Sequence, residues 1–243
     1  MPGARRGAHL PYRTLAGVVP CPGGWLAATG KLQGVTLAPE APQVFPQLRD
    51  ALDYKPSFQV IALFAPIGLM DSPVAGGRAC DHVARALLGW PRSGAIASAP
   101  TRRALACDDY QQAREANGGH LSVIGWRQLP RVAEVDAEMA PYWQRSVFEV
   151  HPELSFFQLN EDRPMRRSKR TRAGQEERAS LLRARLPGIE RILDLRPGRT
   201  SISHVIDAAA CLWTARRIIS RAVTRIPEDP IWDSQGLRME IVR

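Results

Sequence analysis

The chain has 243 residues, of which 44% are hydrophobic and 23% charged. This composition is ordinary for a globular protein and excludes a wholly disordered chain, a collagen and a small disulfide-rich scaffold. The 33 basic residues outnumber the 24 acidic ones, giving a net charge of +9, and all but three of the basic residues are arginines. The basic balance favours a polyanionic partner, either nucleic acid or an acidic membrane surface. An arginine-rich genome would produce the same bias.

The cysteines and the apolar runs predict neither a metal framework nor a membrane span. The cysteines form no CxxC pair and have no zinc-ligand spacing with histidine; they are Cys21, Cys80, Cys107 and Cys211. Reduced thiols in a cytoplasmic protein are the simplest interpretation. The longest apolar run, 60–70, is interrupted by Pro66 and Gly68 and is far shorter than the roughly 20 residues that span a bilayer. We interpret residues 1–12 as a disordered leader.

The first part of the chain predicts a strand meander. Apolar runs separated by turn residues indicate three strands, at 15–19, 25–29 and 34–37. The Pro/Gly-rich stretch 20–24 predicts a hairpin turn rather than a phosphate-binding loop, because no helix and no Gly-Lys-Ser/Thr element follow it. A short amphipathic helix is expected at 47–54. The almost wholly apolar run 58–64 is typical of a strand buried on both faces.

Helical periodicity dominates the rest of the chain. It predicts helices at 78–88, 101–117, 122–139 (bent or restarted at Pro130), 176–185 and 203–222. A strand is expected at 146–150, ended by Pro152, and a last strand with one exposed side at 237–242. Strands first, then a buried strand among helices, indicate a single α/β domain over 13–243 with a mixed sheet.

The segment 163–199 carries nearly all of the net charge, with twelve basic and four acidic residues. Its first part, 163–172, is predicted to be a loop, and arginine forks on a loop suit phosphate oxygens. The candidate nucleic-acid contacts are Arg166, Arg167, Lys169, Arg170 and Arg172. A solvated basic surface or a membrane-facing surface would look the same. The segment lacks interleaved aromatic residues, so base stacking on it is not expected.

Six short motifs, in order and with matching spacing over about 15–242, resemble one known family. They are GVVPCPGGW at 17–25 (family form GVDGCPGGW), APIGL at 65–69 (D-x-PIGL), RACDHVAR at 78–85 (R-x-CD-x-x-AR), EVHPELSF at 149–156 (EVHPE-x-SF), KRT at 169–171 with Gly174 and Arg178 (KKT-x-x-G-x-x-x-R), and DA at 207–208 with TA at 214–215. The family is an uncharacterised one of predicted RNase H-like nucleases. The resemblance implies an RNase H-like fold, with a five-stranded mixed sheet flanked by helices. It also implies two divalent metal ions, Mg²⁺ or Mn²⁺, which are held by carboxylates. Together they would hydrolyse phosphodiester bonds in nucleic acid.

The chain departs from this pattern at two positions. The family's first-strand aspartate falls at Val19, and the aspartate before the PIGL segment falls at Phe64. Glu149 and Asp207 keep the other two acidic positions, and the resemblance makes them the candidate catalytic and metal-ligating residues. Two carboxylates do not balance two divalent ions, whereas one Mg²⁺ commonly uses one or two carboxylates. We therefore expect weak or lost activity.

Two acids near the matched motifs are candidate substitutes for the missing ones, namely Asp71 and Asp81. Asp81 also lies three residues after Arg78 and four before Arg85 on one predicted helix face, where ion pairs are expected. His151 has no neighbouring nucleophile pattern and is interpreted as structural. Ser203 is the expected N-cap of the helix that carries Asp207.

Three functional hypotheses remain open from the sequence. The first is a nuclease-family member with an eroded metal centre. The second is a non-catalytic nucleic-acid-binding or regulatory protein that uses the same cleft and the arginine-rich surface. The third is a structural subunit whose arginines meet an acidic protein partner.

Overall fold

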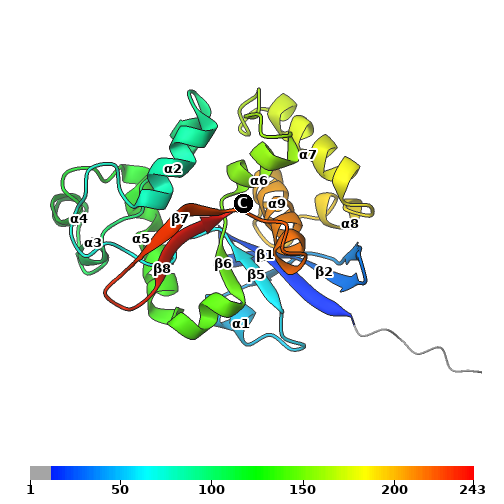
Figure 1. Ribbon diagram of the computed structural model, residues 1–243, viewed down its shortest axis with the longest axis horizontal. Coiled ribbons are helices and arrows are strands. Elements are labelled where there is room, and N and C mark those ends of the chain that lie inside the picture. Colours follow the sequence, from blue (N-terminus) through cyan, green and yellow to red (C-terminus); the bar gives the residue numbers. More distant parts are fainter. Residues whose placement is uncertain (1–11) are drawn as a thin grey trace, which may run out of the picture.

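The computed structural model describes residues 12–243, so the leader expected at 1–12 lies outside the described residues except for Tyr12. At its centre is a mixed sheet with helices on both faces (Figure 1). Its strands are β1 (Arg13–Cys21), β2 (Gly24–Gln33), β3 (Thr36–Pro39), β4 (Gln43–Phe45), β5 (Val60–Leu63) and β6 (Val147–Glu149). They follow the order β3-β2-β1-β5-β6, and β4 pairs with β2. The predicted mixed sheet is confirmed, with six strands instead of five because of the three-residue β4.

The hairpin between β1 and β2 starts the predicted meander. The two strands are antiparallel and paired as far as Cys21 and Gly24, which leaves a two-residue turn. Gly23 and Gly24 both have positive φ, 89° and 145°, a conformation that residues with a Cβ rarely adopt. The hairpin expected at 20–24 is confirmed.

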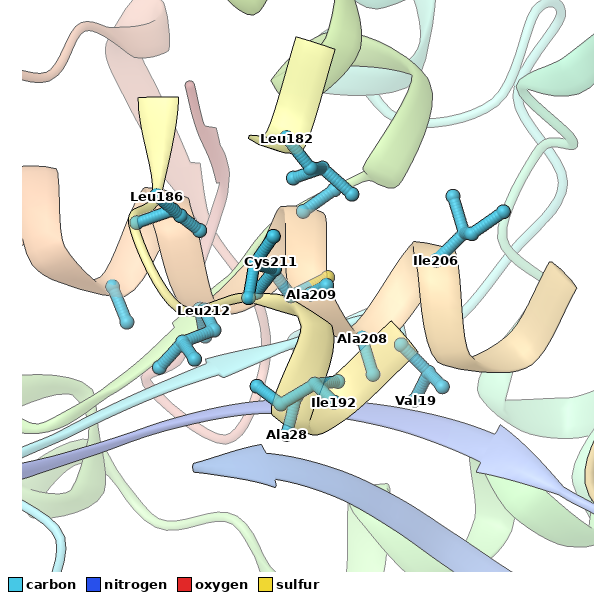
Figure 2. Packing of buried hydrophobic residues seen from close by; sticks show 14 of the residues in the cluster. Val19, Ala28, Leu182, Leu186, Ile192, Ile206, Ala208, Ala209, Cys211 and Leu212 are labelled. Atoms are coloured by element: carbon cyan, nitrogen blue, oxygen red, sulfur yellow. The ribbon is translucent and has the colours of Figure 1, made fainter. Parts of the chain in front are cut away.

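Helix α9 (Ile202–Ile219) covers one face of the sheet against β1, β2 and β5. A Cβ at Gly17 would overlap backbone atoms of Ala208 and Leu212, so glycine allows α9 to approach β1 closely. Val19 lies on this same face and packs in the cluster beside Ala208 (Figure 2). Helices α7 (Arg172–Arg185) and α8 (Glu190–Leu193) pack against α9. The helices predicted at 176–185 and 203–222 are therefore present.

The opposite face of the sheet carries a second core. Helices α1 (Leu48–Leu52) and α5 (Val123–Glu138) contribute to it. Side chains alternate along a strand, so β1 serves both cores: Ala16 and Val18 pack with Trp25 and Val135 on this side. Helix α5 continues through Pro130 as one element instead of restarting there.

The end of the chain forms a separate two-stranded sheet of β7 (Arg225–Trp232) and β8 (Arg238–Val242). Strand β8 confirms the last predicted strand, but its expected exposed side is wrong because Met239 to Val242 are all buried. Strand β7, which the sequence did not predict, and helix α2 (Ala79–Leu88) pack against it.

Two helical predictions in the middle of the chain need correction. The helix expected at 101–117 is two short ones, α3 (Arg102–Leu105) and α4 (Tyr110–Ala116). The side chain of Asp109 accepts the Gln112 amide at 2.9 Å and starts the second one. Helix α6 (Pro152–Leu159) was not predicted, because Pro152 was interpreted as a strand terminator. Proline is equally suited to the first turn of a helix, where no amide donor is needed.

Two 3₁₀ helices complete the described elements, η1 (Arg92–Ala95) and η2 (Pro141–Arg145). Within residues 12–243, none of the helices combines the length and the apolar character needed to cross a bilayer.

Candidate functional site

The carboxyl ends of β1, β5 and β6 meet at one edge of the sheet. These strands are parallel neighbours, with Val18 paired to Leu63 and Leu63 paired to Glu149. The register therefore places Val19, Phe64 and Glu149 at adjacent strand ends. A cavity of about 440 Å³ lies there, and its lining includes all three residues together with Lys169 and Asp207. The four acidic positions implied by the resemblance thus converge on one cavity.

The two apolar replacements are built into this site in different ways. Val19 is only 1% exposed and belongs to the core beneath α9. Phe64 is half-buried, and its ring makes an edge-to-face contact with His151, with ring centroids 4.7 Å apart. Neither side chain offers an oxygen to a cation, so these two positions of the cavity lining are apolar.

The Glu149 carboxylate is fully occupied by protein donors. Its Oε1 accepts Arg78 Nη2 at 2.6 Å, and its Oε2 accepts Arg78 Nη1 at 2.8 Å and the Ile67 amide at 2.7 Å. Such a forked guanidinium–carboxylate pair is strong and geometrically specific. Burial raises the pKa of Glu149 above its ordinary value, and the charge of Arg78 opposes that rise.

Arg78 also binds Asp81, which makes a buried triad of one cation and two carboxylates. Arg78 Nη2 lies 2.8 Å from Asp81 Oδ1, and the predicted pairing of these two residues is confirmed. Arg85 is not part of the triad and instead donates to the carbonyl of Gly76. Burial raises the pKa of Asp81, but the charge and hydrogen bonds of Arg78 outweigh it and hold the pKa below its ordinary value.

Within residues 12–243, the Asp207 carboxylate has one protein donor. Lys169 Nζ lies 2.6 Å from Oδ2, whereas the buried Oδ1 has no hydrogen-bond partner among residues 12–243. Asp207 is in the second turn of α9, whose N-cap is Ser201 and not Ser203 as expected. Ser203 instead donates from its hydroxyl to the Lys169 carbonyl at 3.3 Å, and so ties α9 to the loop that carries the lysine.

Two histidines also line this cavity. His151 caps α6, because its Nδ1 accepts the Glu153 amide at 3.2 Å, which agrees with a structural role. Burial lowers the pKa of His151 to about 3, so its ring is neutral. His204 Nδ1 accepts the Ser201 amide at 3.1 Å, and burial lowers its pKa also. Since Nδ1 accepts, we assign the proton of neutral His204 to Nε2.

The structure separates the two candidate substitute acids. Asp81 lines the cavity as part of the Arg78 triad. Asp71 is exposed and binds Arg102 Nη1 at 3.0 Å, away from the cavity-lining residues. Throughout residues 12–243, no group of three or more His, Cys, Asp or Glu side chains is arranged to hold a metal ion.

The predicted basic loop borders the cavity through Lys169. Arg166, Arg167, Arg170 and Arg172 are exposed. The carboxylate of Glu177, on α7, accepts the backbone amides of Arg166 and Arg167 at 3.0 Å each and so fixes the loop to that helix. Three exposed arginines therefore lie in the same loop as the cavity lysine, and Arg172 follows at the first residue of α7.

Arg178 was counted in the charge of segment 163–199, but it is not a surface group. It is fully buried and pairs with Glu153, with Nη2 2.7 Å from Oε1. The charge of that segment is therefore partly internal.

Comparison with known proteins gives a family without an assigned activity. The family model described as "Protein of unknown function (DUF429)" matches residues 17–231. The chain belongs to this family. No curated protein and no solved structure gave a significant match. The DUF429 match contains every cavity residue named so far, from Val19 to Asp207.

The sequence of this DUF429 member did not reveal which cations pair with the acids of the cavity. Lys169 was expected to contact nucleic acid and Arg78 to pair within its own helix, but neither was assigned to an acid of the cavity. Sequence separations of 71 residues for Arg78–Glu149 and 38 for Lys169–Asp207 leave no local pattern to detect. His204 was missed altogether, although its position three residues after Ser201 fits a capping pair.

Proposed function

We propose that the protein binds nucleic acid without cleaving it, on an α/β scaffold of RNase H-like descent. The observation that carries the proposal is the pairing of each remaining site acid with a protein cation. Glu149 is paired with Arg78 and Asp207 with Lys169. The cavity thus already contains the positive charge that divalent ions would bring to a two-metal nuclease.

The metal pair implied by the family resemblance does not fit these residues. Both oxygens of Glu149 already accept hydrogen bonds from Arg78, and Arg78 is itself only 3% exposed. A metal at Glu149 would have to displace a buried guanidinium and leave it without a counter-charge, which is strongly unfavourable. Val19 and Phe64 supply no oxygen ligands where hard cations require them.

The exposed arginines beside the cavity support a nucleic-acid partner over an acidic protein. Arg166, Arg167, Arg170 and Arg172 lie within seven consecutive positions and are all exposed. Regularly spaced phosphates match such a short, dense run of guanidinium groups, each of which can bind two phosphate oxygens. The cytoplasm is the compartment we propose, since all four cysteines lack disulfide partners.

Binding and cleavage are tested together on labelled single-stranded RNA and DNA. We expect the fluorescence anisotropy to report binding whose affinity falls steeply as salt is added. Affinity should be unchanged by EDTA, and the strand should stay intact with Mg²⁺ or Mn²⁺. Cleavage that needs a divalent ion and disappears in Asp207→Asn would overturn the non-catalytic proposal, and a flat salt dependence would overturn nucleic-acid binding.

A matched pair of charge variants locates the binding surface. The double variant Arg166→Gln/Arg170→Gln should reduce the slope of log K against log salt by about 1.4 for single strands, which corresponds to two lost phosphate contacts. The control Arg183→Gln/Arg185→Gln removes the same charge from the last turn of α7, where both arginines pair with acids. Equal losses in the two variants would mean that the attraction is general and not localised at the loop.

A further inference from the structure

The lining of the cavity beside Lys169 and Asp207 combines polar and apolar side chains. Lys169, His204 and Asp207 are among the polar ones, as are the three members of the Arg78 triad. Val19, Phe64 and Ile124 are among the apolar ones. Its volume of about 440 Å³ lies within the range of about 300–1,000 Å³ common for small-molecule sites. Such a cavity suits a flat apolar group with a polar edge.

The polar residues Lys169, His204 and Asp207 offer hydrogen-bond donors next to an acceptor. The Lys169 ammonium group has three protons, and Asp207 Oδ2 takes one of them. His204 contributes the Nε2 proton assigned above. Asp207 Oδ1 is buried without a partner among the described residues, so the carboxylate is under-satisfied. Supplying a donor to such an atom removes an unfavourable desolvation term.

The apolar part of the lining reaches the surface. Ile124, in the first turn of α5, is 63% exposed and lines the cavity. Phe64 is half-buried and lines it too, with Lys169 Nζ 6.0 Å from its ring centroid. A planar ring in the cavity would bury its faces against apolar side chains of the lining while its edge met Lys169 and Asp207.

We propose that this cavity receives one unstacked nucleobase of a bound strand while the arginines of the loop hold the neighbouring phosphates. The inference rests on the proposed nucleic-acid binding and adds which part of the strand enters the protein. A base with an amino group beside a ring nitrogen, as in adenine or cytosine, would donate to Asp207 and accept from Lys169.

Charge favours the base over the phosphate as the inserted group. A phosphate in the cavity would lie beside the carboxylate of Asp207, whose only donor in the described part of the chain is Lys169, and like charges at short range repel. A neutral base avoids that repulsion. Asp207 Oδ1 is shielded in this conformation, so the amino group would reach it after a shift of Lys169, whose side chain is 34% exposed.

The test compares two short strands of equal charge, a homopolymer of deoxycytidine and a strand of the same length that is abasic at every position. We expect the abasic strand to bind about tenfold more weakly, since loss of one base contact in single-strand binding is of that order. The affinity ratio between the strands is the readout. In Asp207→Asn and in Lys169→Gln this ratio should fall towards one, while the control Asp194→Asn, at the exposed end of α8, should keep it.

The outcomes separate this inference from the function on which it rests. Salt-dependent binding of both strands with equal affinity would overturn the base pocket and leave nucleic-acid binding standing. Binding of neither strand would overturn both. If Asp207→Asn fails to fold, as judged by circular dichroism, Lys169→Gln alone decides. A wild-type ratio in a folded Lys169→Gln variant would also overturn the base pocket.

Discussion

Glu149 and Asp207 line the same cavity and are equally buried, each with 7% of its side chain exposed, yet they are held in different ways. Among the described residues, Glu149 has three hydrogen bonds from two residues, and its cation, Arg78, is 3% exposed. Asp207 has one bond there, from a lysine that is 34% exposed. The Glu149 carboxylate is therefore held by buried donors, whereas the Asp207 carboxylate is held by a lysine that is free to move.

The difference teaches that two acids at matching family positions need not share a role. Removing one partner of a buried ion pair is strongly destabilising, because the other charge is left buried without compensation. A flexible lysine on an under-satisfied carboxylate can exchange one partner for another, because ammonium groups have no fixed fork geometry. We infer that the Glu149 side of the cavity supports the structure and that the Asp207 side meets the ligand.

The largest expected effect is the loss of Arg78. Arg78→Met would leave Glu149 and Asp81 buried without their cation, and we expect a loss of about 3–5 kcal/mol in the free energy of unfolding. Lys169→Met should lose only about 1 kcal/mol, because the lysine is partly exposed and its removal lets water reach Asp207. Urea denaturation of both variants gives the comparison. Equal losses would show that the two sides of the cavity are held alike.

The carboxylates themselves give a smaller contrast. In Glu149→Gln an amide NH₂ would face the donors of Arg78, and we expect a loss of about 2–3 kcal/mol, the range for hydrogen bonds to charged groups. In Asp207→Asn the amide oxygen can keep the Lys169 bond, and no partnered oxygen is lost, so stability should change by less than about 1 kcal/mol. The midpoint of urea unfolding measures both. A loss in Asp207→Asn as large as that in Glu149→Gln would contradict the distinction.

Acid should weaken the Arg78 triad through Asp81. The pKa of Asp81 is held below its ordinary value in the folded protein, so its contribution is complete well above pH 4. It is lost as the pH falls through the unfolded value of about 3.9 towards the lower folded one. Asp81→Asn should therefore be less stable than the wild type at pH 7, and the gap should narrow below about pH 4, by at most about 1.4 kcal/mol per pH unit.

The raised pKa of Glu149 acts in the opposite direction, because a protonated Glu149 favours the folded state at low pH. The charge of Asp81 contributes to the raised pKa of Glu149, so the difference between the two proteins reports Asp81 together with its coupling to Glu149. A gap that stays constant from pH 7 to pH 3 would mean that Asp81 gains nothing from Arg78.

Much of the fold follows from local pattern. Alternation and apolar runs predicted β1, β2 and β5, and the Pro/Gly turn predicted their hairpin, because turn chemistry and burial periodicity are local properties. Strand β7 was missed because Arg225 to Trp232 contains two prolines and two acids, a composition that is typical of a loop. It forms by pairing with β8, although Ile226 is the single buried residue of β7.

The sequence predicted individual positions of the site but not the contacts between them. The family motifs indicated Glu149, Asp207 and the replaced positions Val19 and Phe64, and the sheet register brings all four to one cavity. The partners of the two acids come from a separate helix and a loop, and ion pairs between distant segments leave no periodic signal. Arg178 illustrates the same limit, since its place in a basic run gave no sign that it is buried against Glu153.

The smallest expected effect on binding concerns how firmly Lys169 is held. Thr171 caps α7 by accepting the Gly174 amide at 3.1 Å, and its hydroxyl lies 2.9 Å from the Ser168 carbonyl, next to Lys169. Thr171→Ala should lose about 1 kcal/mol of stability, as N-cap deletions do. It should also weaken oligonucleotide binding a few-fold, because the loop that carries the lysine is released from the start of α7.

Asp109→Ala provides the matched control, since Asp109 caps α4 in the same way and does not line the cavity. It should show a similar loss of stability with unchanged binding. If both cap deletions weakened binding equally, the effect would come from general destabilisation, and the loop would have no particular part in placing Lys169. If Thr171→Ala alone weakened oligonucleotide binding, the position of Lys169 at the cavity would depend on the α7 cap.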